Sequence, residues 1–234
     1  MMGPTHALSG VAAFLAAAPF VERYLTPMGP FELVVGTALA AGAALVPDLD
    51  HADATIANTY GPLTGALAWF VSLISGGHRN GTHSLLGIAV FTGLAYAATW
   101  SDIAAGIVCW VLLGVAVRGF GATGDGALAV IANAVLAGAA AAALVVFVPG
   151  VLWMLPVAMG IGAAAHVVGD CLTDMGCPLA WPLSQTMMGL PLVDTDGLRE
   201  KYIVVPGLTV GAAVLSLVAT GVWSPLVRYV TAAI

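Results

Sequence analysis

The stretch ALAVIANAVLAGAAAAALVVFV (residues 127–148) contains no charged residue, and Asn133 carries its one polar side chain. Such a run is typical of a transmembrane helix, because about 20 apolar residues span the hydrocarbon core of a bilayer. Other apolar runs lie at about 6–21, 31–47, 83–100, 103–120, 151–169 and 203–221. The sequence therefore predicts an all-α, polytopic bundle of about seven transmembrane helices.

Two other apolar stretches do not fit a full span. Residues 62–76 are interrupted by Gly and Ser and are flanked by Pro62 and Gly76-Gly77, so we predict a re-entrant or interfacial helix there. Residues 222–234 are too short to cross a bilayer. Residues 1–234 are interpreted as one multi-pass membrane domain.

The composition supports a membrane setting. Hydrophobic residues make up 60% of the chain and charged residues 8%, whereas roughly a quarter of residues are charged in soluble proteins. The mean hydropathy is +1.01. A net charge of -6 argues against nucleic acid as a partner, because phosphate binding needs clustered Lys and Arg. The three cysteines form no CxxC pair and are interpreted as free thiols, a Cys171–Cys177 bridge being the alternative.

All five histidines lie in short polar patches that border apolar runs. The patches are Thr5-His6, Pro47-Asp48-Leu49-Asp50-His51, His78-Arg79-Asn80-Gly81-Thr82-His83-Ser84, and His166 with Asp170, Thr173 and Asp174. Imidazole and carboxylate together are the ligands of zinc, manganese and iron sites. The patches therefore predict a metal site, the alternative being a polar structural cluster that holds no metal.

The order of the spans places these patches on one side of the membrane. If the chain crosses the membrane once per span, four segments share one side. They are the N-terminus with His6, and residues 47–83, 118–126 and 170–202. That side carries four basic residues, Arg79, Arg118, Arg199 and Lys201, against two on the other. The positive-inside rule then predicts that the site faces the cytoplasm.

Local spacing brings some of these side chains together. His166 and Asp170 are four residues apart and share one face of a helix, and Asp174 follows one turn later if the helix continues. Pro47 is expected to end the second span and turn the chain. The similarity of residues 5–10 to residues 82–87 suggests an internal duplication, which makes Asp125 a remote further ligand candidate.

The motifs, taken in order, resemble the YdjM-like family. They are Leu45-Val46-Pro47-Asp48-Leu49-Asp50-His51, His78-Arg79-x-x-Thr82-His83-Ser84, His166-x-x-x-Asp170-x-x-Thr173, and Gly176-Cys177-Pro178-Leu179-Ala180-Trp181-Pro182-Leu183. The resemblance implies a bacterial inner-membrane protein described as LexA-binding or LexA-regulated and as a metal-dependent hydrolase. Two positions depart from the family pattern: Asn80-Gly81 replaces a Gly-aromatic pair, and Asp174 stands where proline is common. Both departures affect the wall of the expected pocket.

We expect one to three divalent ions, zinc first and manganese as the alternative. The candidate ligands are His6, Asp48, His51, His78, His83, His166 and Asp170, and the candidate catalytic residues are Asp50, Arg79 and Asp174. Paired metal ions suit phosphoester hydrolysis, and an arginine such as Arg79 can pair with a phosphate. The substrate expected at a membrane face is a lipid or a lipid-linked phosphoester.

Two other classes of function remain open at this point. The chain could be a metal or proton transporter, or a non-catalytic membrane partner of a regulatory protein that docks on residues 170–202. No His-Glu-x-x-His, Gly-x-Ser-x-Gly or Walker motif occurs in the sequence, which disfavours a zincin-type protease, a serine hydrolase and a P-loop enzyme.

Overall fold

The chain is built from helices throughout the residues that the computed structural model describes, which are 1–25, 27–124 and 126–220. These residues form eight α-helices and no β-strand, which confirms the predicted all-α class. The helices are α1 (Gly3–Tyr24), α2 (Pro30–Ala43), α3 (Pro62–Ser75), α4 (Leu85–Ala98), α5 (Asp102–Gly119), α6 (Ala127–Phe147), α7 (Met154–Cys171) and α8 (Val205–Ala219). Asp125 and the stretch 222–234, both considered above, lie outside the described residues.

Six helical stretches are long and apolar enough to cross a membrane. They are Gly3–Tyr24, Pro30–Asp50, Asp102–Gly119, Ala127–Phe147, Pro149–Cys171 and Glu200–Ala219. Each corresponds to one of the seven predicted runs. The seventh run, 83–100, forms α4, which has 14 residues and is therefore about 21 Å long.

Helix α4 nevertheless connects the two ends of the bundle, because it packs antiparallel to α7. At its start, the backbone nitrogen of Leu85 donates to the carbonyl of Leu179, which follows the end of α7. Farther along, Thr92 lies beside Gly160, near the middle of α7. The chain therefore runs through α4 away from the end of the bundle that carries the histidines, and it returns to that end through α5.

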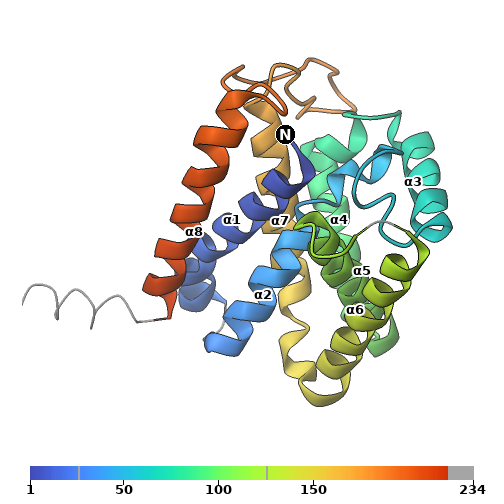
Figure 1. The fold of residues 1–234 in the computed structure, drawn as a ribbon, viewed down its shortest axis with the longest axis vertical. Helices are drawn as coiled ribbons and strands as arrows, with labels where there is room; N and C mark the ends of the chain where they lie inside the picture. The colour runs from blue at the N-terminus through green and yellow to red at the C-terminus, as the bar shows by residue number, and fades with distance from the viewer. Residues whose placement is uncertain (26, 125, 221–234) are drawn as a thin grey trace, which may run out of the picture.

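Helices α1, α2 and α7 pack against one another and form the centre of the bundle (Figure 1). Small residues allow this close packing. A Cβ atom on Gly42 would lie 2.0 Å from the carbonyl oxygen of Leu112 on α5, and one on Gly162 would lie 2.5 Å from that of Ala40 on α2. Only glycine fits at these two positions, as expected where helices approach closely in a membrane.

One end of this bundle gathers the polar segments. Helix α1 begins there, α2 and α7 end there, and α8 starts there, as the ribbon shows (Figure 1). A 3-10 helix, Pro47–Asp50, follows α2, and a second one, Gly81–His83, precedes α4. The side chain of Ser84 caps α4 by accepting from the nitrogen of Gly87 at 3.0 Å, which fixes the position of the preceding residue, His83.

Residues 172–199 run over the same end without forming an α-helix. Paired backbone hydrogen bonds between Cys177 and Met188 hold this segment together. A bond from the nitrogen of Leu190 to the carbonyl of Cys171 attaches it to α7. The segment leads into the π-helix Glu200–Val204 and then into α8. All three cysteines are free thiols, as interpreted from the sequence.

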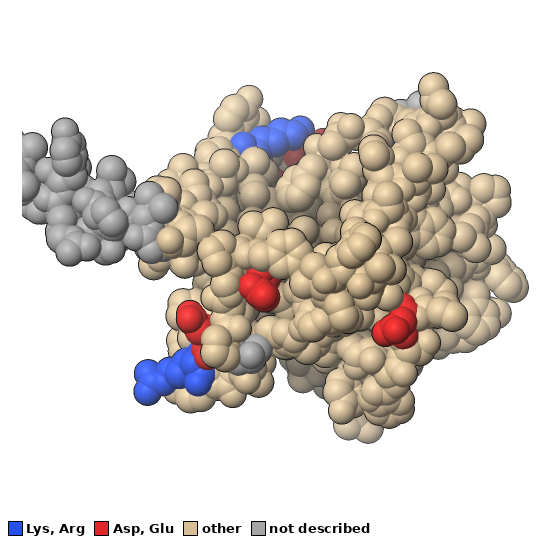
Figure 2. All heavy atoms as spheres, turned by 90° about the horizontal axis from the view of Figure 1, so that it is seen from below, with Lys and Arg blue, Asp and Glu red and all other residues tan. Residues whose placement is uncertain are grey.

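Seen from below, the described residues carry few charged side chains, among them an acidic and a basic one side by side (Figure 2). Helix α3 stands apart from the centre and packs on the 3-10 helix Pro47–Asp50. It has 14 residues and exposes large apolar side chains such as Trp69 and Leu73. A helix therefore forms in residues 62–76, and its re-entrant or interfacial position stays a prediction.

Candidate metal centre

Four segments that are distant in the sequence bring their histidines and aspartates together. His6 comes from the first turns of α1, Asp48 and Asp50 from the 3-10 helix after α2, His78 and His83 from the segment before α4, and His166 and Asp170 from the last turns of α7. Two groups could hold a metal ion: Asp48, Asp50, His78 and His83, and His6, His166 and Asp170. The structure thus unites the predicted patches at one end of the bundle.

Four atoms lie close together where these two groups adjoin. The Nε2 atoms of His83 and His166 are 3.1 Å apart. Oδ1 of Asp48 lies 3.5 Å from each of these two nitrogens. Oδ2 of Asp170 lies 3.5 Å from Nε2 of His83 and 3.6 Å from Nε2 of His166. These five distances match five of the six edges of a tetrahedral site; the sixth edge, from Asp48 to Asp170, joins the two groups.

The ring of His166 is held so that its inner nitrogen carries a lone pair. Its Nδ1 donates to the carbonyl oxygen of Ala44 at 2.7 Å, and a carbonyl can only accept. Nε2 of the neutral ring is therefore the acceptor that points at Asp48 and Asp170. This arrangement, in which a backbone carbonyl orients a histidine, is common beside metal ions.

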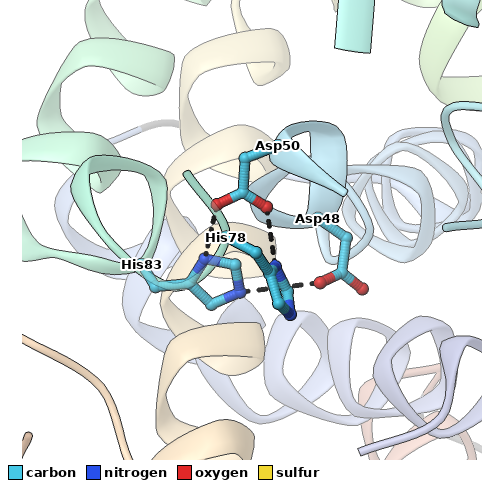
Figure 3. A group of neighbouring side chains, drawn as sticks. All are labelled: Asp48, Asp50, His78 and His83. Atoms are coloured by element: carbon cyan, nitrogen blue, oxygen red, sulfur yellow. Dashed lines mark hydrogen bonds and ion pairs between the residues drawn. The ribbon is translucent and has the colours of Figure 1, made fainter. Parts of the chain in front are cut away.

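Thr82 and Asp50 play the corresponding part for His83: Nδ1 of His83 is 2.9 Å from the hydroxyl oxygen of Thr82, and Asp50 lies behind them (Figure 3). Oδ2 of Asp50 lies 3.5 Å from Nδ1 of His83 and accepts from the hydroxyl of Thr82 at 2.5 Å. The same carboxylate lies 2.9 Å from Nδ1 of His78. Asp50 is fully buried and surrounded by donors, so it orients two histidines and does not face the tetrahedron.

The two carboxylates decide the charge of His83. Burial alone lowers the pKa of this ring, but hydrogen bonds to Asp48 and Asp50 outweigh it and raise the pKa to about 9. A proton thus stabilises the cluster when no cation is bound. Because a metal ion binds the neutral ring, it would take the place of this proton.

His6 lies on the inner side of the cluster and is completely buried. Its ring stacks on that of His166, with the ring centres 3.7 Å apart. Its Nε2 is 3.2 Å from Oδ1 of Asp170, but neither ring nitrogen makes a well-aligned hydrogen bond. Buried nitrogens without hydrogen-bond partners are uncommon and are a sign of a bound group.

Arg79 does not point toward an open pocket. Its Nη2 is 3.1 Å from Oδ2 of Asp170, and its Nη1 donates to Thr173 and to the carbonyl of Gly176. The residue has a φ of 57°, a left-handed conformation that costs a non-glycine residue of order 1–3 kcal/mol. The guanidinium thus joins the segment after α7 to Asp170, whereas the sequence suggested a phosphate-binding role.

His78 and His51 form the open edge of the cluster. The side chain of His78 is 33% exposed, and the rings of the two histidines meet edge to face, with centres 4.5 Å apart. Asp48 is also partly exposed, at 18% of its side chain. Solvent therefore reaches the cluster from the side of residues 48–51 and 78.

Asp174 lies outside both groups, and its side chain is exposed. The sequence placed it one turn beyond Asp170 on a continuing helix, but α7 ends at Cys171. The chain turns there because the nitrogen of Thr173 bonds to the carbonyl of Asp170, so Asp174 points away from the cluster.

Several functional contacts were not assigned from the sequence. Thr82 and Thr173 stood within the motifs, but their links to Asp50 and Arg79 are visible only in three dimensions. Glu200 was missed altogether. It is buried and accepts from the backbone nitrogen of Met2 at 2.7 Å, which fastens the start of α1 to the start of α8. An acidic residue directly before an apolar run was the one available signal.

The fold and this cluster define a polytopic helical membrane protein with His/Asp groups that could bind a metal ion. A family model for the YdjM inner membrane protein family matches residues 1–232. The chain therefore belongs to that family, as the resemblance of its motifs indicated. Searches of curated proteins and of solved structures gave no match.

Proposed function

We propose that this protein is a membrane-embedded, metal-dependent hydrolase that acts on a phosphoester of a lipid or of a lipid-linked molecule. The five close approaches among Asp48, His83, His166 and Asp170 carry the proposal, because they match five edges of a tetrahedral site. Two imidazole nitrogens 3.1 Å apart beside two carboxylate oxygens require a positive charge among them, and a metal ion would replace the proton that His83 carries in its absence.

Zinc is the ion that fits this arrangement best. A tetrahedral site with metal–ligand distances of about 2.0–2.2 Å has ligand atoms roughly 3.3–3.6 Å apart. The five distances among the four atoms are 3.1, 3.5, 3.5, 3.5 and 3.6 Å. Asp48 contributes a negative charge to a divalent ion there, whereas Asp170 also pairs with Arg79 at 3.1 Å and with the ammonium of Met1 at 2.6 Å. Manganese favours octahedral oxygen ligands, which makes it the second choice.

Metal ions polarise phosphoryl oxygens and activate water, and two neighbouring ions suit phosphoester hydrolysis. The group formed by Asp48, Asp50, His78 and His83 could hold a second ion, for which Asp50 would be a buried ligand, and His78 lies at the solvent-exposed edge. In the net reaction, water attacks phosphorus, the ester P–O bond breaks, and the released alcohol takes a proton. Arg79 positions Asp170, and Asp50 positions His78 and His83; Asp174 has no part in this proposal.

The orientation that we propose places this end of the bundle in the cytoplasm. Arg118 lies in the last turn of α5 and Arg199 directly before the π-helix, both at that end, while Arg23 lies at the other end of α1. The positive-inside rule supports this orientation. A site at the membrane surface gives access to lipid head groups from the cytoplasmic leaflet.

The test combines metal analysis with a hydrolysis assay. Protein purified in detergent should contain at least one zinc ion per chain and should release alcohol from a phosphodiester lipid, in a reaction that a chelator stops. Asp48→Asn should lose both metal and turnover, whereas Asp53→Asn, an exposed aspartate in the same loop, should keep both. Metal transport into liposomes without hydrolysis would contradict the proposal. So would a metal-poor protein whose metal content and hydrolysis are not restored by added zinc or manganese.

A further inference from the structure

Helix α7 carries two apolar grooves on its outer side, at the end where the metal cluster lies. The first groove lies between α1, α7 and α8 and has a volume of about 550 Å³. The second lies between α4, α7 and the segment after α7, with a volume of about 430 Å³. Both are lined almost entirely by apolar atoms.

One stripe of α7 separates the two grooves. Ala164, Val168 and Leu172 line both of them and are spaced four residues apart, so they lie on one side of the helix. Val168 is 61% exposed and forms the ridge between the grooves. His166 and Asp170 belong to the same turns but face inward, so the metal cluster and the two grooves share one stretch of helix.

The walls of the first groove belong to three of the helical stretches that could cross a membrane, which are those of α1, α7 and α8. Apolar grooves along such helices face hydrocarbon, and their natural occupants are lipid chains. Two grooves side by side match the two acyl chains of a glycerophospholipid. A lipid with a single polyprenyl chain would need only one.

The head-group end of the first groove reaches the metal cluster at Gly169. A Cβ atom on this residue would lie 3.5 Å from Cε1 of His6 and 3.6 Å from its Nδ1. The missing side chain therefore leaves the His6 ring directly behind the groove wall. Nε2 of this buried ring faces Asp170 at 3.2 Å, whereas Nδ1 has no hydrogen-bond partner and offers a polar contact beside the groove.

From these observations we infer that the substrate is a diacyl glycerophospholipid, with one acyl chain on each side of the Ala164–Val168–Leu172 stripe and its phosphoester toward His6. This inference rests on the proposed function and names the substrate class of the same site. Lipid binding along α7 can be measured without turnover, so the lipid site and the hydrolase activity can be tested separately.

The test uses the full chain in liposomes of phosphatidylethanolamine and phosphatidylglycerol. A phosphatidylglycerol with a photoactivatable acyl chain should crosslink to peptides from both grooves, those containing Ala12 of α1 and Ile88 of α4. Ala164→Phe places a large ring in both grooves and should reduce this crosslinking several-fold. Ala140→Phe is the matched control, because it changes a different apolar groove between α1, α2, α5 and α6.

The inference is supported if Ala164→Phe also lowers turnover of the diacyl lipid but spares metal content and turnover of a short water-soluble phosphodiester. It is overturned if Ala164→Phe and Ala140→Phe reduce crosslinking equally, or if undecaprenyl phosphate displaces the probe and unlabelled phosphatidylglycerol does not. Specific crosslinking without any hydrolysis would support the lipid site and contradict the hydrolase. Hydrolysis of the diacyl lipid that Ala164→Phe leaves unchanged would contradict the lipid site alone.

Discussion

The neighbouring carboxylates Asp48 and Asp50 should differ in their effect on metal affinity, because only one of them faces the tetrahedron. Oδ1 of Asp48 lies 3.5 Å from Nε2 of both His83 and His166, which is the edge length of a direct ligand. Oδ2 of Asp50 lies 3.5 Å from Nδ1 of His83, on the far side of the ring. The imidazole thus separates Asp50 from the ion.

These positions set the expected magnitudes. With a metal–nitrogen distance of about 2.1 Å, the Asp50 oxygen is roughly 6–7 Å from the ion, about three times as far as a ligand oxygen. Its Coulomb attraction to the ion is therefore about a third as large. Changes to groups that orient a metal ligand typically lower affinity 10–100-fold, or about 1.4–2.7 kcal/mol. We expect Asp50→Asn to fall in this range and Asp48→Asn to exceed it.

The assay is competition for zinc with a coloured chelator, carried out on each variant in detergent. Asp53→Asn serves as the control, because this exposed aspartate shares the loop but contacts neither group. Helix content from circular dichroism shows whether a variant is folded. A larger loss for Asp50→Asn than for Asp48→Asn would refute the tetrahedral assignment and favour a site centred on Asp50 and His78.

Three further outcomes are expected. Chelation should lower the melting temperature, since an ion at 100 times its dissociation constant adds about 2.7 kcal/mol of stability; an unchanged melting curve after complete metal removal would argue against a bound ion. Arg79→Ala should weaken zinc binding as well as turnover, because the guanidinium contacts Asp170 at 3.1 Å; unchanged zinc affinity with a raised KM would instead indicate phosphate binding. With native cysteines removed, Tyr24→Cys in intact cells should react with an impermeant thiol reagent and Asn58→Cys should not. The reason is that α1 and α2 place these two exposed residues at opposite ends of the bundle. The reverse labelling pattern would contradict the proposed orientation.

The helices could be predicted from the sequence because lipid imposes a simple rule on apolar length. Residues 127–148 contain no charge, and the observed helix is Ala127–Phe147. The rule says less about residues 83–100, where the helix starts only after the cap at Ser84 and ends at Ala98. Hydrophobic length alone does not show that the segment before Ser84 is needed for the metal cluster.

The identity of the clustered residues was also accessible from the sequence, because ionisable groups beside apolar runs are few in this chain. Their individual roles were not. Asp48 and Asp50 are two residues apart and chemically identical, yet only Asp48 faces the ring nitrogens. Arg79 was predicted to bind a phosphate, but its guanidinium forms an ion pair with Asp170. Such distinctions depend on how α2, α4 and α7 pack, which spacing along the chain does not reveal.

The short length of α4 has a consequence for the surrounding bilayer. A helix of 14 residues rises about 21 Å, against a hydrocarbon thickness of about 30 Å. Hydrophobic mismatch of this kind is relieved when the bilayer thins locally. Lipids beside α4 are then drawn inward relative to those beside α6, which has 21 residues. Because His83 lies two residues before the start of α4, we expect this depression in the membrane surface to bring head groups toward the level of the His/Asp cluster.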